Sequence, residues 1–192
     1  MTKKEIKRRK YVSRHEAGHA LTGVVLGIPV FKVSIGETGA NDTHGLLGRN
    51  TKVGGACVYG DGTDKLGASV RIIDACTTLM GGIAANKEFP NAGCITKWDL
   101  EGGGGGYDYR LAVQFAEKAM GGPAMLWDAI QAAEVKEYLN QKLLAAHAIL
   151  RDNLKALEEI AGLLYDGRTL TGDECIAIVA KHRSTAGRVA GR

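Results

Sequence analysis

The sequence predicts a mainly α domain of the α+β class, with one small β-sheet and a C-terminal helical bundle. Apolar residues recur at steps of three and four over most of the chain, which is the period of a helix with one buried face. Apolar–polar alternation, typical of a half-buried strand, is confined to short segments. The 192 residues, 45% of them hydrophobic and 24% charged, are enough for one ordinary core. We therefore expect residues 1–192 to form a single domain.

A long helix over residues 2–26 is predicted at the start of the chain. A glycine and then a proline follow its last turn, and both residue types end helices. Thr2-x-x-Glu5 and Ser13-x-x-Glu16 both have the form of a capping box, so either could mark the start of the helix.

A small sheet is expected to follow this helix. Residues 30–35 alternate, which places Phe31, Val33 and Ile35 on one face of a half-buried strand. Two further strand-like pieces, at 44–49 and 56–59, lie in a stretch rich in Gly, Asn, Asp and Thr. These features predict a small sheet with loose connections.

The rest of the chain is expected to be helical apart from one irregular segment. Helical periodicity covers residues 65–87, 107–120 and 124–151, and a further apolar stripe lies within 154–164. A capping box, Thr171-x-x-Glu174, precedes a last helix at 175–182. The irregular segment, 89–106, ends in five consecutive glycines.

The first predicted helix carries His15-Glu16-Ala17-Gly18-His19, an H-E-x-x-H motif. Residues four apart lie one above the other on a helix, so His15 and His19 can bind one zinc ion. Glu16 then reaches the water at an open coordination position, whose pKa zinc lowers towards about 7. This set of groups is what amide hydrolysis at neutral pH requires. The alternative is that both histidines are polar residues on the exposed face of an amphipathic helix.

Two histidines need a third protein ligand, and three acidic residues are candidates. The sequence lacks the extended motif H-E-x-x-H-x-x-G-x-x-H, because Thr22 and Val25 occupy the last two positions. Glu37 follows the predicted strand, and Glu88 ends the second helix. Asp108 shares a helix face with apolar residues and therefore points inward, which makes it the better of the three. A lone Asp at a helix start is also favoured by the helix dipole alone.

Several segments resemble the peptidase domain of the FtsH-type ATP-dependent zinc metalloproteases. The sequence HEAGHA at 15–20 is followed by VFKVSI at 30–35, where that family has a strand of the kind HKVSI. Three more segments match in the same order: LMGGIAA at 79–85, GYDYRLA at 106–112, and the pairs Leu163-Leu164 and Thr169-Leu170. The likeness covers nearly the whole chain.

The resemblance implies that His15, His19 and Asp108 bind Zn²⁺ and that Glu16 is the catalytic base. It also implies a zincin-like helical metallopeptidase domain, with a metal-site region at 1–120 and a helical region at 121–192. A strand near the site would pair with an extended polypeptide substrate.

The chain also departs from this family at several positions. The arginine and paired glutamate of its second motif stand here as Ile83, Asn86 and Lys87, and Tyr107 replaces an asparagine before the aspartate. No G-x-x-x-x-G-K-[ST] motif occurs, so the family's ATPase module is absent from this sequence. We therefore expect a zinc endopeptidase that cleaves flexible or unfolded polypeptides, or one supplied by a separate ATPase. A non-catalytic zinc-bound scaffold is the alternative.

Charge and cysteine content limit the kinds of partner and the cellular compartment that can be expected. The net charge is +4, but the basic residues gather at the chain ends with few aromatics among them, which argues against nucleic-acid binding. No apolar run is long enough to span a membrane, and the N-terminus is charged. The four cysteines form no C-x-x-C pair. We expect a cytoplasmic protein without membrane or nucleic-acid partners, and a homo-oligomer is compatible with the sequence.

Glycine is the unusual feature of the composition. The chain has 27 glycines, about twice the usual share. Many fall in 36–67 and in the run at 102–106, which we expect to form mobile walls around the metal site. The run at 102–106 is also expected to be poorly ordered without substrate. The remaining histidines, His44, His147 and His182, are expected to be ordinary surface or packing residues, with only His44 in a loop that could approach the site.

Overall fold

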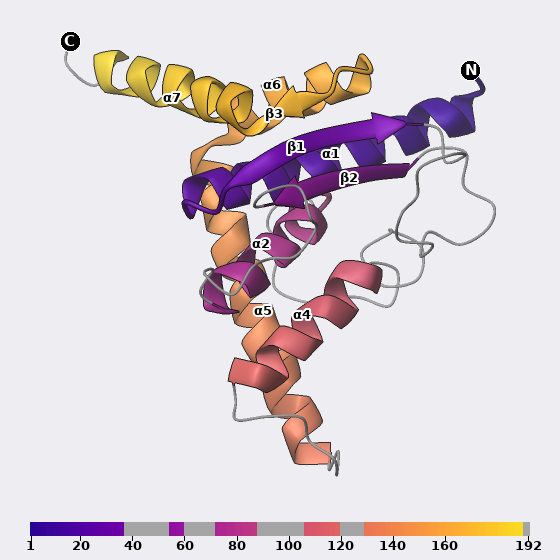
Figure 1. Cartoon of the computed structure of the whole chain (residues 1–192), viewed down its shortest axis with the longest axis vertical. Coiled ribbons are helices and arrows are strands. Elements are labelled where there is room, and N and C mark those ends of the chain that lie inside the picture. Colours follow the sequence, from indigo (N-terminus) through magenta and orange to yellow (C-terminus); the bar gives the residue numbers. More distant parts are fainter. Residues whose placement is uncertain (37–53, 60–71, 88–105, 120–128, 190–192) are drawn as a thin grey trace.

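The computed structural model describes residues 1–36, 54–59, 72–87, 106–119 and 129–189 (Figure 1). Within these ranges it contains six helices and three strands. The helices are α1 (Lys3–Val25), α2 (Ile72–Ala85), α4 (Gly106–Ala119), α5 (Ala129–Asp152), α6 (Leu154–Tyr165) and α7 (Gly172–Val189). The strands are β1 (Val30–Gly36), β2 (Gly54–Tyr59) and β3 (Leu170–Thr171). The prediction of a mainly helical fold with one small sheet is confirmed.

Helix α1 begins at the first of the two possible capping boxes. The Thr2 side chain accepts a hydrogen bond from the Glu5 backbone N–H, and the Glu5 carboxylate accepts one from the Thr2 backbone N–H at 2.6 Å. Ser13 instead lies inside the helix, where its hydroxyl donates to the Arg9 carbonyl. The helix ends before Gly27, which has a positive φ of 73° that a residue with a side chain rarely adopts.

The sheet is antiparallel, with strand order β2-β1-β3. Strand β1 matches its prediction, but Phe31 does not lie on the buried face with Val33: it is 49% exposed, whereas Val33 is fully buried. The β1–β2 register shifts between Val30 and Lys32, and such a bulge interrupts the alternation of faces at Phe31. The third strand, β3, was not predicted from the sequence. The strand expected at 44–49 lies outside the described residues.

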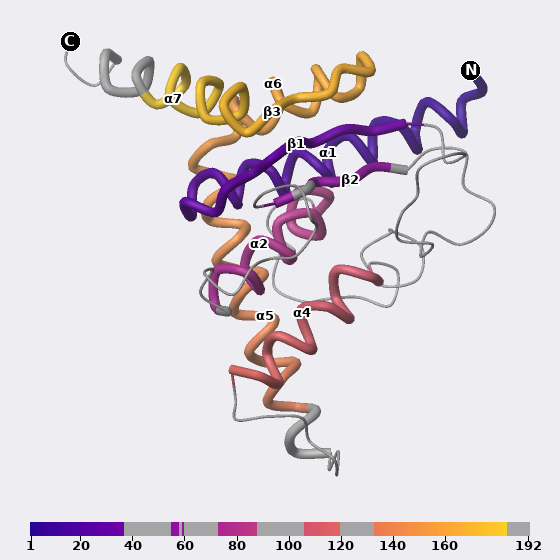
Figure 2. The backbone as a smooth tube through the Cα atoms, viewed as in Figure 1, coloured from indigo at the N-terminus to yellow at the C-terminus, as the bar shows by residue number. Residues whose placement is uncertain are grey.

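Figure 1 shows how the helices lie relative to the sheet. Helix α1 passes behind the strands, α6 and α7 lie to one side of them, and α2, α4 and α5 lie to the other. The backbone trace in Figure 2 shows α4 crossing α5, and α4 also packs against α2. A hydrophobic core runs through all of these helices, and its largest fully buried side chains include Leu21, Met80, Leu143 and Leu157.

None of the described helices combines the length and the apolar character that crossing a bilayer requires.

Most helix bounds agree with the predicted ones. The start of the helix predicted at 65–87 falls outside the described residues, as do the first residues of the one predicted at 124–151.

Candidate metal centre

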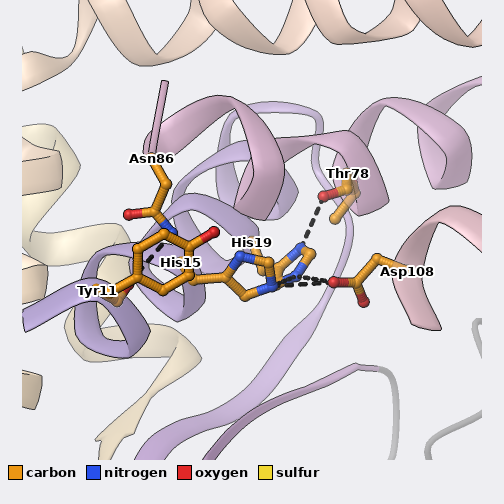
Figure 3. A network of polar contacts seen from close by, with 6 residues as sticks. All are labelled: Tyr11, His15, His19, Thr78, Asn86 and Asp108. Carbon is orange, nitrogen blue, oxygen red and sulfur yellow. Dashed lines mark hydrogen bonds and ion pairs between the residues drawn. The ribbon is translucent and has the colours of Figure 1, made fainter. Parts of the chain in front are cut away.

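Two helices bring three possible metal ligands together (Figure 3). His15 and His19 lie one turn apart on α1, and Asp108 lies in the first turn of α4. The Asp108 Oδ2 atom is 2.9 Å from His15 Nε2 and 3.3 Å from His19 Nε2, and the two Nε2 atoms are 3.2 Å apart. The structure therefore places the third predicted ligand, Asp108, against both histidines, 93 positions from His15 in the sequence.

The spacing of these atoms fits a tetrahedral metal ion. Zinc binds His nitrogen at about 2.0–2.1 Å and carboxylate oxygen at about 2.0–2.2 Å, which puts two ligand atoms of a tetrahedron about 3.3–3.5 Å apart. Two of the three distances, 3.2 and 3.3 Å, are close to these values, and the His15–Asp108 distance of 2.9 Å is shorter by about 0.4 Å. Two nitrogens and one oxygen also leave a fourth coordination position for water or substrate, as in catalytic zinc sites.

A backbone carbonyl fixes the protonation of His19. Its Nδ1 atom lies 3.0 Å from the Thr78 carbonyl oxygen on α2. Because a carbonyl only accepts, Nδ1 carries the proton, and the neutral ring has its lone pair on Nε2, facing the site. This second contact to a ring N–H is the usual arrangement for a metal-binding histidine.

His15 is oriented mainly by ring contacts. The Tyr11 ring stacks near it, with centroids 6.4 Å apart and an interplanar angle of 18°, and the His19 ring meets it edge-on at 4.7 Å. Asn86 at the end of α2 donates from Nδ2 to the Tyr11 carbonyl oxygen, which joins this turn of α1 to α2 (Figure 3). The His15 Nδ1 atom is buried and has no hydrogen-bond partner among the described residues.

The charges of the site stabilise one another. Burial alone would lower the pKa of His19, but the charge and hydrogen bond of Asp108, together with the Glu16 charge and the Thr78 carbonyl, raise this pKa to about 9. Burial raises the pKa of the Asp108 carboxyl. The charge on His19 and hydrogen bonds from both imidazoles outweigh this effect and hold that pKa well below its usual range. The Asp108 carboxylate is therefore ionised, as a metal ligand must be.

Glu16 lies beside this cluster on the next position of α1. It is only 7% exposed. Burial raises the pKa of its carboxyl, and the charges of His15 and His19 oppose part of that rise. A carboxylate with a raised pKa is a stronger base than an ordinary glutamate, which suits a group that takes a proton from water. Its aliphatic part contacts the backbone of β2 at Gly55.

Glycines allow α1 and α2 to approach closely at the site. A Cβ atom at Gly82 would collide with His19 Nε2 and would lie 2.7 Å from His15 Cε1. One at Gly81 would lie 2.6 Å from Thr22 Oγ1, and one at Gly18 would collide with the Gly81 carbonyl. Small residues on both helices therefore permit this close approach. The roles of Gly82 and Gly55 were missed, although the Gly-Gly pairs at 54–55 and 81–82 are visible in the sequence.

The other predicted candidates do not join the described cluster. Glu37, Glu88, His44 and most of the glycine run at 102–106 lie outside the residues that the structure describes. Among the described residues, neither His147 nor His182 joins the group of possible metal ligands. His147 is buried on α5, His182 hydrogen-bonds Glu159 between α6 and α7, and Ile83 is buried in the core.

No protein-family model matches this sequence, and no curated protein matches it significantly. The likeness to the FtsH-type peptidases therefore remains a resemblance, carried by the motif at 15–20 and by the segments that follow it.

Proposed function

We propose that this protein is a zinc-dependent endopeptidase that hydrolyses flexible or unfolded polypeptides, as its resemblance to the FtsH-type metalloproteases suggests. The observation that carries the proposal is the position of Asp108. Its Oδ2 atom lies within 3.3 Å of both Nε2 atoms of the H-E-x-x-H histidines, at distances that suit a tetrahedral ion. A pair of histidines on an exposed helix face would have no need of an acidic side chain from a distant helix.

Each residue of the site has a distinct part in this chemistry. Zinc, when bound, supplies a Lewis acid that lowers the pKa of water and polarises a peptide carbonyl. His15, His19 and Asp108 hold the ion, and the Thr78 carbonyl keeps the His19 lone pair directed at it. Glu16 takes the proton from the attacking water and can deliver it to the leaving amine.

The position of β2 supports an extended peptide as substrate. Among the strands that the structure describes, β2 is at one edge of the sheet, next to β1, and its Gly55 contacts Glu16. An edge strand offers unpaired backbone groups that an extended chain can pair with, so side-chain identity matters less than chain flexibility. A folded substrate would first have to be unfolded, and a separate ATPase is one agent that could do so.

The test compares wild type with Glu16→Gln, and with Glu158→Gln as a matched control on the exposed surface of α6. Zinc content is measured first, then hydrolysis of casein. We expect about one zinc per chain in all three proteins and a loss of at least about 100-fold in kcat in Glu16→Gln alone. Equal activity in wild type and Glu16→Gln, or a folded protein that binds no zinc, would contradict the proposal.

A non-catalytic zinc-bound scaffold, or a subunit that needs a separate ATPase, is the second candidate. It is favoured by Ile83, which is buried in the core at the position where the FtsH-type family has an arginine. The scaffold predicts stoichiometric zinc without any Glu16-dependent hydrolysis, and the same experiment therefore separates it from the peptidase.

A further inference from the structure

We propose that Gly55 is a positioning residue for catalysis. Because Gly55 has no side chain, the backbone of β2 packs directly against the Glu16 side chain and holds it towards the metal ligands. This inference rests on the proposed function, because it assigns a role to Gly55 through Glu16. It concerns the sheet, whereas the metal ligands come from α1 and α4.

The contact between Gly55 and Glu16 is close and selective. A Cβ atom at Gly55 would lie 2.5 Å from Glu16 Cγ, 2.8 Å from Oε1 and 2.9 Å from Cδ. These are its three nearest neighbours, and all belong to one side chain. Any residue other than glycine would therefore act first on the Glu16 carboxylate and its stem.

Neither side of this contact can easily move away. Gly55 pairs with Ile35 of β1, and the Ile35 side chain is buried in the core. The pairing with β1 therefore holds β2 in place. On the other side, Glu16 is flanked in α1 by His15 and by Ala17, which is completely buried. The strain of an added methyl group would thus fall on the torsion angles of Glu16, its one flexible part.

The size of the displacement gives the expected effect. An ordinary Cβ contact begins at about 3.4 Å, so Glu16 Cγ, at 2.5 Å from the new methyl, would have to move by about 0.9 Å. A misplacement of about 1 Å of a catalytic group costs about 100-fold in rate. The zinc ligands are not among the atoms that the methyl group meets, so zinc affinity should be kept.

The test uses Gly55→Ala with Gly36→Ala as its matched control. Gly36 lies in the adjacent strand, and a Cβ atom there would meet no atom of the described residues within 4 Å. In Gly55→Ala we expect kcat to fall about 100-fold, with KM and the zinc dissociation constant within about twofold of wild type. Gly36→Ala should keep the wild-type kcat. A Gly55→Ala enzyme with wild-type kcat, or one that has lost its zinc, would overturn the inference.

A double-mutant cycle on stability tests the contact without reference to activity. Glu16→Ala removes the three atoms that the new methyl group would meet. In metal-free protein, Gly55→Ala should lower the unfolding temperature by about 3 °C or more, but by less than about 1 °C in the Glu16→Ala background. If Gly55→Ala alone does not fold, the double variant should fold. Equal effects in both backgrounds would show that Gly55 does not act through Glu16.

The outcomes separate the two proposals. If Glu16→Gln is inactive while Gly55→Ala is fully active, only the role of Gly55 fails. If wild type and Glu16→Gln are equally active, the peptidase fails and the catalytic role of Gly55 fails with it, even where the stability cycle shows the contact.

Discussion

Replacement of Gly82 by alanine should disable zinc binding, because this residue of α2 faces both histidines. The new Cβ atom would collide with His19 Nε2 and would lie 2.7 Å from His15 Cε1. To restore an ordinary contact of about 3.4 Å, the His15 ring or the helix must move by about 0.7 Å. Zinc–ligand distances tolerate only about 0.2 Å, so the displacement exceeds the tolerance more than threefold.

We expect Gly82→Ala to weaken zinc binding by at least about 100-fold, which corresponds to ~2.7 kcal/mol. Competition with a chromophoric chelator measures the affinity, and thermal unfolding of the metal-free protein measures any general damage. Gly162→Ala is the matched control, since a Cβ atom at this glycine of α6 would meet nothing within 4 Å. It should leave zinc affinity unchanged and raise stability by up to about 1 kcal/mol through helix propensity. A Gly82→Ala protein that binds zinc within twofold of wild type would refute the assigned geometry.

Two further predictions concern stability away from the site. Leu143→Ala should lower the free energy of unfolding by about 2–5 kcal/mol in chemical denaturation, because Leu143 is fully buried, whereas Leu144→Ala should lower it by under about 1 kcal/mol, because Leu144 is 49% exposed. Similar losses would mean that α5 is rotated. Hydrogen bonds from Lys181 and the adjacent histidine hold the pKa of Glu159 below its usual range, so its contribution is present above about pH 4.5 and is lost as the pH falls through the lowered value. Glu159→Gln should therefore lower the free energy of unfolding by at most about 1 kcal/mol at pH 7 and by less below pH 4. Glu158→Gln should leave the stability unchanged at both pH values. A loss of stability in Glu159→Gln that grows at low pH would contradict this prediction.

The part of the site that the sequence could predict comes from side chains at regular spacing. His15 and His19 are four apart in a segment with clear helical periodicity, and α1 places them on one face. Asp108 could be preferred over Glu37 and Glu88 because it shares a helix face with apolar residues. Its distance to the histidines depends on how α4 packs against α2, which no local pattern encodes.

The missed contributions have physical reasons of their own. Thr78 acts through its backbone carbonyl, and every residue has one, so its side chain gives no signal. Gly55 and Gly82 act through the absence of a side chain, and their effect depends on which neighbour lies opposite. Strand β3 has two residues, too few for alternation to be recognised, and the exposure of Phe31 depends on a bulge in the pairing with β2.

The pairing of β1 with β3 has a consequence for how the chain folds. Lys32 lies opposite Thr171, so the two strands join segments more than two thirds of the chain apart. Closing so long a loop costs entropy before the strand contacts repay it, which slows folding relative to a bundle of sequential helices. During synthesis, α1 with its two histidines would leave the ribosome long before β3 exists to complete the sheet. The two histidines are therefore made early, whereas the sheet that packs against α1 is completed late.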